Sequence, residues 1–190
     1  QAGLPTLLHS AGHTSATTVL ETDRRPASDT EAAMLEIESG TDVLMLRRLR
    51  YADGVPLSLD LSLFVGEQVP DLLDQPLDGS VYELLRQRYA LEPVATTETI
   101  EVVSASPREA AWLRIAHRKP LLAITRVTRD ASGRPFELAY DLFRADRGRL
   151  TATSGGAGVS PVSATVVPDP AGKAPGSGAG RGRGRGTPGG

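Results

Sequence analysis

Two arginines one residue apart, Arg48 and Arg50, lie in a run whose apolar and polar residues alternate as in a β-strand. A second alternating run follows a short turn and carries Asp60. Guanidinium groups bind phosphate and carboxylate through paired hydrogen bonds, and a nearby carboxylate can accept a hydrogen bond from a ligand hydroxyl. The three side chains could therefore form an anion-binding site if the hairpin brings them to one face.

The length of the turn decides whether they share a face, because side chains alternate across a strand. A two-residue Asp-Gly turn would pair Arg48 with Leu59, which sets the arginine among leucines. A three-residue Ala-Asp-Gly loop would pair Arg48 with Ser58 and Leu46 with Asp60. We expect the second register, which gathers the arginines, Ser58 and Asp60 on one side of the hairpin.

Two interpretations of this polar face remain open. In the first, the face is exposed to solvent and Arg48 forms an ion pair with Asp60, worth about 0–1 kcal/mol. In the second, the arginines line an anion pocket that is completed by the unpaired backbone N–H groups of a helix N-terminus. The run DGSVY at residues 78–82 supplies such a helix start, where Ser80 also has an ordinary role as N-cap.

Three short helices are predicted by the capping-box pattern, in which a serine is followed three residues later by glutamate. The pattern occurs at residues 28–31, 80–83 and 106–109. A further short helix is expected over residues 5–10, ending at Gly12.

Six strands are predicted between these helices. Alternating runs over 43–51 and 57–64, and over 121–129 and 136–143, flank glycine-containing loops and indicate two hairpins, and β-branched runs over 17–21 and 96–103 indicate two more strands. Because hairpins are antiparallel, the predicted fold class is α+β, an antiparallel sheet with flanking helices. The two hairpins are weakly similar when residues 54–64 are laid over residues 133–143, which suggests a pseudo-symmetric sheet.

Composition divides the chain into a domain over residues 1–150 and a tail over residues 151–190. The tail is dominated by Gly, Pro, Ala and Ser, so it buries too little apolar surface to offset its ordering entropy, and we expect it to be disordered. The tail has four basic residues and one acidic residue, so the chain's formal charge of -2 leaves -5 on residues 1–150. A mildly acidic domain argues against a nucleic-acid-binding surface, and the RGRGRG run at 181–186 fits a solvated end.

Residue types that support other chemistry are scarce. The chain has no cysteine, which excludes disulfides and thiolate catalysis and fits a reducing cytoplasm. The histidines, His9, His13 and His117, lack the spacing of metal ligands. No apolar run reaches the length of a membrane span, and the first residues do not resemble a signal peptide. We therefore expect no catalytic residue, no metal, no cofactor, no membrane contact and a cytoplasmic location.

Four blocks of the sequence taken together are similar to one known family. The blocks are LRRLRYADGVPLSLDLSLF, DGSVYELLRQRYAL, TTETIEVVSAS and LLAITRVTRDASGRPFELAYDLFRADR. Over residues 4–149 they resemble UTRA, the effector-binding domain of GntR-superfamily, HutC-type transcription regulators. The resemblance implies a chorismate-lyase-like fold and a role in sensing a small anionic metabolite, such as a phosphosugar, a phosphonate or a carboxylate.

The same resemblance implies a ligand site. In relatives that bind sugar phosphates, two arginines that match Arg48 and Arg50 hold the phosphate. A serine and a tyrosine that match Ser80 and Tyr82 complete that contact.

Two carboxylates, matching Asp60 and Glu137, face the rest of the ligand in those relatives. Asp60 stands where glutamate is usual, which implies a different ligand size or hydroxyl geometry. A further serine of the family's site would fall near Thr6.

A homodimer is also implied, as is DNA binding through a winged helix-turn-helix domain that precedes the sensor. No such domain lies upstream of residue 4 in this sequence, so DNA binding is implied for a longer relative only. In such a relative, the effector would shift the population between arrangements of the paired DNA readers. The effector, the operator and the sign of regulation stay open.

Two other functions remain possible on the sequence. One is a chorismate-lyase-like enzyme, since fold does not settle function and a lyase would also bind an anionic substrate with arginines. Against it, no acid, base and nucleophile stand out together. The other is a ligand- or partner-binding module without a DNA-binding role. Trp112 and its apolar neighbours are expected to belong to the core or to a dimer contact.

Overall fold

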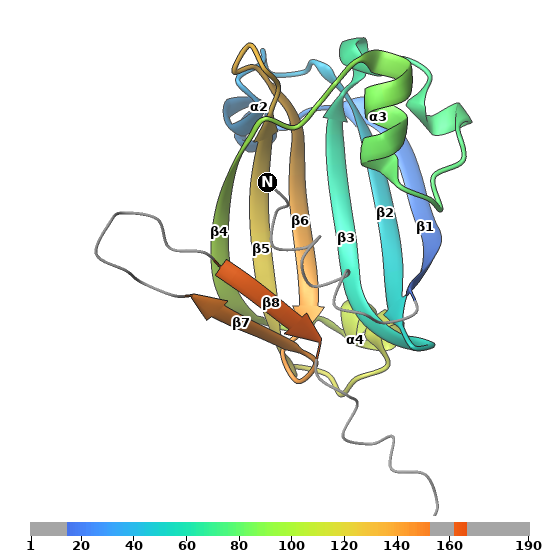
Figure 1. Cartoon of the computed structure of the whole chain (residues 1–190), viewed down its shortest axis with the longest axis vertical. Coiled ribbons are helices and arrows are strands. Elements are labelled where there is room, and N and C mark those ends of the chain that lie inside the picture. Colours follow the sequence, from blue (N-terminus) through green and yellow to red (C-terminus); the bar gives the residue numbers. More distant parts are fainter. Residues whose placement is uncertain (1–14, 153–161, 167–190) are drawn as a thin grey trace, which may run out of the picture.

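The computed structural model describes residues 15–152 and 162–166 of the chain. Six strands form one antiparallel sheet in the order β1-β2-β3-β6-β5-β4 (Figure 1). The strands are β1 (Ser15–Pro26), β2 (Asp42–Ala52), β3 (Val55–Val65), β4 (Ala95–Ser104), β5 (Pro120–Arg129) and β6 (Pro135–Arg144). The predicted α+β class and all six predicted strands are confirmed, although β1 is longer than expected. The helix expected over residues 5–10 lies outside the described residues.

The three capping serines begin the three α-helices, α2 (Asp29–Leu35), α3 (Val81–Tyr89) and α4 (Pro107–Leu113). In each, the serine Oγ accepts a hydrogen bond from the backbone N–H three residues later. The capping box is complete at α2 and α4. At α3 the glutamate side chain instead accepts a hydrogen bond from Gln87. Two short 3₁₀ helices that the sequence did not predict, η1 (Gly66–Gln68) and η2 (Leu72–Asp74), precede α3.

The helices cover both faces of the sheet (Figure 1). On one face, α2 packs against one end of the strands through Leu35, and α4 packs against the other end through Leu113. On the opposite face, Val81 and Leu85 of α3 pack against a buried apolar cluster that includes Phe64. Since α3 covers only part of that face, a polar region of the sheet beside it remains accessible.

The sheet has the internal symmetry that the sequence suggested. The units β1-α2-β2-β3 and β4-α4-β5-β6 have the same order of elements, and their last strands, β3 and β6, are neighbours at the centre of the sheet. Leu61 and Tyr140, which occupy equivalent positions in the two similar segments, pair directly with each other. The pseudo-two-fold axis therefore passes between β3 and β6 at this pair.

The register of the first hairpin differs from the expected one. The turn is the two-residue Asp53-Gly54, with positive φ at both positions, as a type I′ turn requires. Arg48 pairs with Asp60 and Arg50 pairs with Ser58, so the expected pairing of Arg48 with Ser58 is wrong. The arginines, Ser58 and Asp60 nevertheless lie on one face as predicted, because β3 contains one extra residue after the turn that restores the alternation.

In each hairpin, the strand after the turn contains one extra, bulged residue, which lies next to a proline. Tyr51 pairs with Pro56 while Arg50 pairs with Ser58, which leaves Leu57 as the bulged residue of β3. In the second hairpin the same irregularity follows Pro135 at the start of β6. Proline has no N–H to donate to a strand ladder, so an interior strand accommodates it at a bulge.

A separate two-stranded sheet follows the six-stranded one. Strand β7 (Gly148–Ala152) pairs antiparallel with β8 (Val162–Val166). Residues 151–152 and 162–166 belong to the tail that we expected to be disordered, so that expectation is wrong for these residues. The reason is local, because the run VSATV has the β-branched composition of a strand within a segment poor in large apolar residues. The rest of the tail lies outside the described residues.

Candidate functional site

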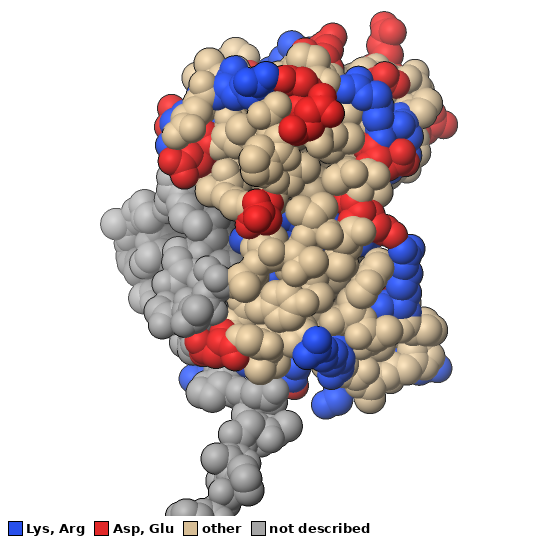
Figure 2. Space-filling model, turned by 90° about the vertical axis from the view of Figure 1, so that its right-hand side faces the viewer, with Lys and Arg blue, Asp and Glu red and all other residues tan. Residues whose placement is uncertain are grey.

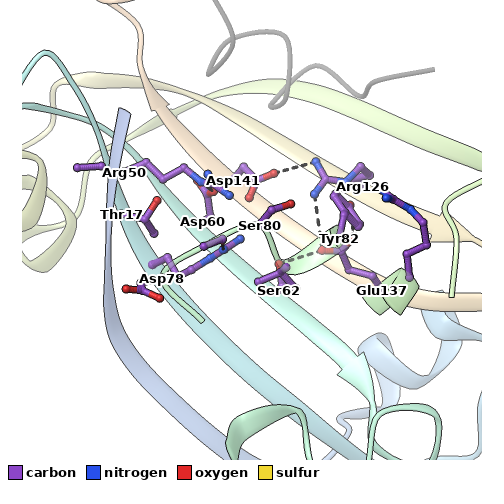
Figure 3. A pocket seen from close by; sticks show the side chains of 15 residues that line it. Thr17, Arg50, Asp60, Ser62, Asp78, Ser80, Tyr82, Arg126, Glu137 and Asp141 are labelled. Carbon is purple, nitrogen blue, oxygen red and sulfur yellow. Dashed lines mark hydrogen bonds and ion pairs between the residues drawn. The ribbon is translucent and has the colours of Figure 1, made fainter. Parts of the chain in front are cut away.

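A cavity of about 580 Å³ lies between the start of α3 and the polar face of the sheet. The six residues predicted to bind a ligand all line it: Arg48, Arg50, Asp60, Ser80, Tyr82 and Glu137. Figure 3 labels all of them except Arg48. The remaining lining residues are Ala16, Thr17, Ser62, Asp78, Gly79, Val81, Arg86, Arg126 and Asp141. Thr6, the remaining residue that the resemblance implied, lies outside the described residues, as do His9 and His13.

Arg48 is the buried cation at the helix end of the cavity, and the residue is only 5% exposed. Its Nη1 atom donates to the backbone carbonyls of Leu77 and Gly79, at 3.5 and 3.3 Å, and its Nε atom has no hydrogen-bond partner among the described residues. Burial lowers the pKa of Arg48, and the neighbouring Arg50 lowers it further. The interpretation of a solvent-exposed Arg48 is therefore wrong.

The ion pair with Asp60, which the first of the two open interpretations assigned to Arg48, is formed by Arg50. Arg50 Nε donates to Asp60 Oδ2, and Ser58 Oγ donates to Asp60 Oδ1 at 2.8 Å. Asp60 is itself buried. The arginine that is half-buried thus has a carboxylate partner, whereas the more deeply buried Arg48 makes its hydrogen bonds to neutral carbonyl groups.

The N-terminus of α3 reaches this arginine face. The contact of Arg48 with the Gly79 carbonyl places the helix start, capped by Ser80, beside the guanidinium group. The backbone N–H groups in the first turn of a helix have no intrahelical partners, and the helix dipole is positive at this end. The cavity therefore has a cationic side made of a guanidinium group, a hydroxyl and helix amides.

Glu137 anchors the opposite side of the cavity. Its carboxylate accepts hydrogen bonds from Ser62 Oγ at 3.0 Å and Thr128 Oγ1 at 2.9 Å. The hydroxyl of Tyr82 donates to the same carboxylate. Burial raises the pKa of Tyr82, and the charge of Glu137 raises it further, so the phenol remains a donor.

Two buried residues of the site were missed by the sequence analysis, Arg126 and Asp141. Arg126 of β5 pairs with Ala139 of β6, so its diagonal neighbours on the same face are Glu137 and Asp141. Its nitrogens lie 3.0 Å from Asp141 and 3.7 Å from Glu137 (Figure 3). A third carboxylate, Glu98, lies 4.0 Å away. Burial alone would lower the pKa of Arg126, but these carboxylates outweigh it and raise that pKa.

Asp141 has a strongly perturbed environment. It is 2% exposed, and its partner directly across the β3–β6 boundary is Asp60. Burial raises the pKa of Asp141 to about 8, and the Asp60 carboxylate contributes to the increase. A signal for this residue existed in the sequence, because Asp141 lies four positions after Glu137 and therefore on the same face of the strand.

The outer surface gives no sign of a nucleic-acid interface on the side shown in Figure 2. Over the described part of that face, basic and acidic side chains are interspersed, and the basic ones do not gather into a continuous patch. Within residues 15–152 and 162–166, no helix is long and apolar enough to cross a bilayer, and no group of His, Cys, Asp and Glu side chains is arranged to hold a metal ion.

A polar cavity between a helix and a sheet, with convergent charged groups, is typical of a small-molecule-binding domain. The family model of the UTRA domain matches residues 10–149, and the chain belongs to this family. It is the effector-binding domain found in GntR-family transcription regulators, and its relatives are regulators, not enzymes. The chorismate-lyase-like fold that the resemblance implied is confirmed.

Individual relatives agree with this assignment. The chain is 29% identical over 143 residues to the probable fructoselysine utilization operon transcriptional repressor of Shigella flexneri, which covers 75% of this chain and 58% of that protein. The crystal structure of the effector domain of PhnF from Mycobacterium smegmatis matches with a TM-score of 0.69 and 27% identity, covering 72% of this chain and 84% of that one. The C-terminal domain of Yurk from Bacillus subtilis matches with a TM-score of 0.64 and 26% identity, covering 67% and 88%. The chain spans about half the length of the curated relatives that it matches.

Proposed function

We propose that this domain senses a small anionic effector, with a phosphate or phosphonate group as the best fit, and that in a longer regulator this binding controls transcription. The observation that carries the proposal is Arg48. It is buried, it lines the cavity, and its Nε atom has no partner among the described residues. Burial lowers the pKa of Arg48, and Asp60, Glu137 and Asp141 raise it through space, but none of these carboxylates forms an ion pair with it. A buried guanidinium group without a direct ionic partner is costly, and an anion in the cavity would supply that partner.

The surroundings of Arg48 favour a group with several oxygens. Arg50 lies two residues along the same face, and Ser80 offers a hydroxyl beside the amides of α3. Arginine forks and helix N-termini are both suited to phosphate, which accepts hydrogen bonds from several directions at once. Asp60 and Glu137 would then receive hydrogen bonds from the rest of the ligand.

The regulatory context is proposed from the relatives. Two of them, from Shigella flexneri and Escherichia coli, are named as probable transcriptional repressors of a fructoselysine utilization operon, and another is named as the transcriptional repressor PhnF. We infer that residues 1–150 form the sensor, that residues 151–190 are an appended segment, and that a winged helix-turn-helix reader precedes the sensor in a longer, dimeric and cytoplasmic protein. The effector would then change the spacing of the two DNA readers by favouring one arrangement of the dimer.

A thermal-shift and calorimetric titration of the chain tests the proposal. Inorganic phosphate, sugar phosphates and alkylphosphonates are added to the wild type, to Arg48→Met and to Arg118→Met, whose arginine is exposed in the loop before β5. We expect at least one phosphate compound to raise the melting temperature of the wild type and of Arg118→Met. Arg48→Met should bind the same compound at least about tenfold more weakly, since a charge-assisted hydrogen bond is lost.

Two results would overturn the proposal. One is the absence of any shift by phosphate compounds at millimolar concentration. The other is equal affinity of Arg48→Met and the wild type, which would place the binding elsewhere on the molecule.

A further inference from the structure

The side of the cavity away from α3 has more carboxylates than cations. Arg126 is faced by Asp141, Glu137 and Glu98 at 3.0, 3.7 and 4.0 Å. Figure 3 shows the Arg126 guanidinium group in contact with both Asp141 and Glu137. Arg126 is 6% exposed, and its Nε atom has no hydrogen-bond partner among the described residues. Asp141 and Glu137 thus share one ion-paired guanidinium group, because Arg86, the exposed arginine of α3 at the cavity, forms no ion pair with either of them among the described residues.

Asp60 is a further carboxylate on this side of the cavity. Asp60 and Asp141 lie directly opposite each other on β3 and β6, an arrangement that destabilises a sheet when both are charged. Arg50 forms its ion pair with Asp60, and Asp141 forms its ion pair with Arg126, while Arg50 lowers the pKa of Asp141 only through space. Burial and the neighbouring Asp60 carboxylate raise the pKa of Asp141 to about 8, so in the ligand-free domain near neutral pH this carboxyl group retains a proton.

The cavity is therefore bipolar. Next to α3, Arg48 is a cation with no carboxylate committed to it, and along β5 and β6 the carboxylates outnumber Arg126. A ligand hydroxyl would add one hydrogen bond to the carboxylate side but would leave its charge unchanged. A protonated amine would supply both the hydrogen bonds and the charge.

We propose that the effector is zwitterionic, carrying a protonated amine that binds among Asp60, Glu137 and Asp141 in addition to the anionic group that binds at Arg48. This inference rests on the proposed function and names the chemical class of the effector. Proton balance follows from the geometry: the ammonium group replaces the proton on Asp141, which leaves for solvent, so binding near neutral pH releases up to one proton.

Matched synthetic probes separate this inference from the proposed function. The probes are inorganic phosphate, 3-aminopropyl and 5-aminopentyl phosphate, and 3-hydroxypropyl and 5-hydroxypentyl phosphate. We expect inorganic phosphate to bind weakly and at least one amino compound to bind about tenfold or more tightly than its hydroxy counterpart, a difference of about 1.4 kcal/mol. Equal affinities of the amino and hydroxy compounds in each pair would overturn the inference and leave the proposed function intact. Failure of every phosphate to bind would overturn both.

Asp141→Asn locates the amine contact. The variant should lose the preference for the amine, measured as the ratio of the affinities of each amino compound and its hydroxy counterpart in the same protein. Asp74→Asn removes the same charge at an exposed position of η2 outside the cavity and should keep the preference. A full amine preference in Asp141→Asn would contradict the inference.

Calorimetry of the wild type gives a test that does not depend on any variant folding. Titrations near pH 7 in two buffers of different ionisation enthalpy measure the protons released on binding. The amino compound should release more protons than its hydroxy counterpart. The hydroxy compound carries the same phosphate group, so the difference between the two excludes protons released by that group. Equal proton release by the two compounds would show that the amine does not meet the Asp141 carboxyl.

Discussion

Asp60 and Asp141 face each other across the two central strands of the sheet, and both side chains are buried. A pair of like charges in this position opposes folding, so the sheet tolerates it only through Arg50, Arg126 and a bound proton. The pair lies one position away from the pseudo-two-fold axis at Leu61 and Tyr140. The symmetric half of the sheet has no such pair, because Ser62 lies opposite Ala139.

The first prediction concerns stability and pH. The pKa of Asp141 is raised in the folded state above its value of about 3.9 in an unfolded chain. The unfolded state thus releases this proton at lower pH than the folded state, and the associated stability falls as pH rises from about 4 towards 8. Relative to Asp141→Asn, the ligand-free wild type should lose at least about 1 kcal/mol of unfolding free energy between pH 5 and pH 9.

Urea denaturation of the two proteins at pH 5, 7 and 9 measures this difference. Other titrating groups are common to both proteins and largely cancel. Asp74→Asn, compared with the wild type in the same way, should show a nearly flat difference, because Asp74 is exposed. A difference between wild type and Asp141→Asn that stays constant or grows with pH would contradict the prediction.

The second prediction is that Arg48 lowers the stability of the ligand-free domain. Arg48→Met removes a buried charge whose hydrogen bonds are to two carbonyl groups, and methionine fills a similar volume. The variant should unfold about 2–4 °C above the wild type, corresponding to about 1 kcal/mol. Differential scanning calorimetry without phosphate in the buffer checks this. A clearly lower melting temperature would mean that Arg48 has a structural role.

Local sequence signals predicted the three α-helices, the six strands of the large sheet and the shared face of Arg48 and Asp60. Serine caps, glycine turns and strand alternation are short-range features, and each of the three helix starts was readable from four residues. The pairing of the hairpin was not predicted, because it depends on the bulge at Leu57. Pro56 in an interior strand was the available sign of that bulge.

Arg126 and Asp141 are the two buried site residues that the sequence analysis did not predict. Their contact requires the pairing of β5 with β6 in a particular register, with Arg126 opposite Ala139. Alternation places Asp141 on the face of Glu137 but gives neither its burial nor its position opposite Asp60. Those properties arise from the joining of two hairpins that are far apart in the sequence.

The third prediction concerns the segment after the six-stranded sheet. Strands β7 and β8 form a sheet of their own, and an isolated two-stranded sheet is at best marginally stable. A chain that ends at residue 147, before β7, should melt within about 2 °C of the full chain, because the large sheet and its three helices are retained. Thermal unfolding followed by circular dichroism compares the two. A loss of more than about 5 °C would show that this segment packs on the sensor.

The fourth prediction separates the two roles of Ser80, as helix cap and as part of the anion site. Aspartate caps a helix as well as serine does, so Ser80→Asp should keep the unfolding free energy within about 0.5 kcal/mol of the wild type. The new carboxylate would lie beside Arg48 and repel phosphate, so affinity for phosphate compounds should fall at least about tenfold.

Ser28→Asp is the matched control, because Ser28 caps α2 on the opposite face of the sheet and does not line the cavity. This variant should retain both stability and phosphate affinity. Urea denaturation measures the unfolding free energy of the wild type, Ser80→Asp and Ser28→Asp, and titration measures their affinity for phosphate. If Ser80→Asp binds phosphate as tightly as Ser28→Asp does, the N-terminus of α3 contributes only to the fold, and the anion must bind through the arginines alone.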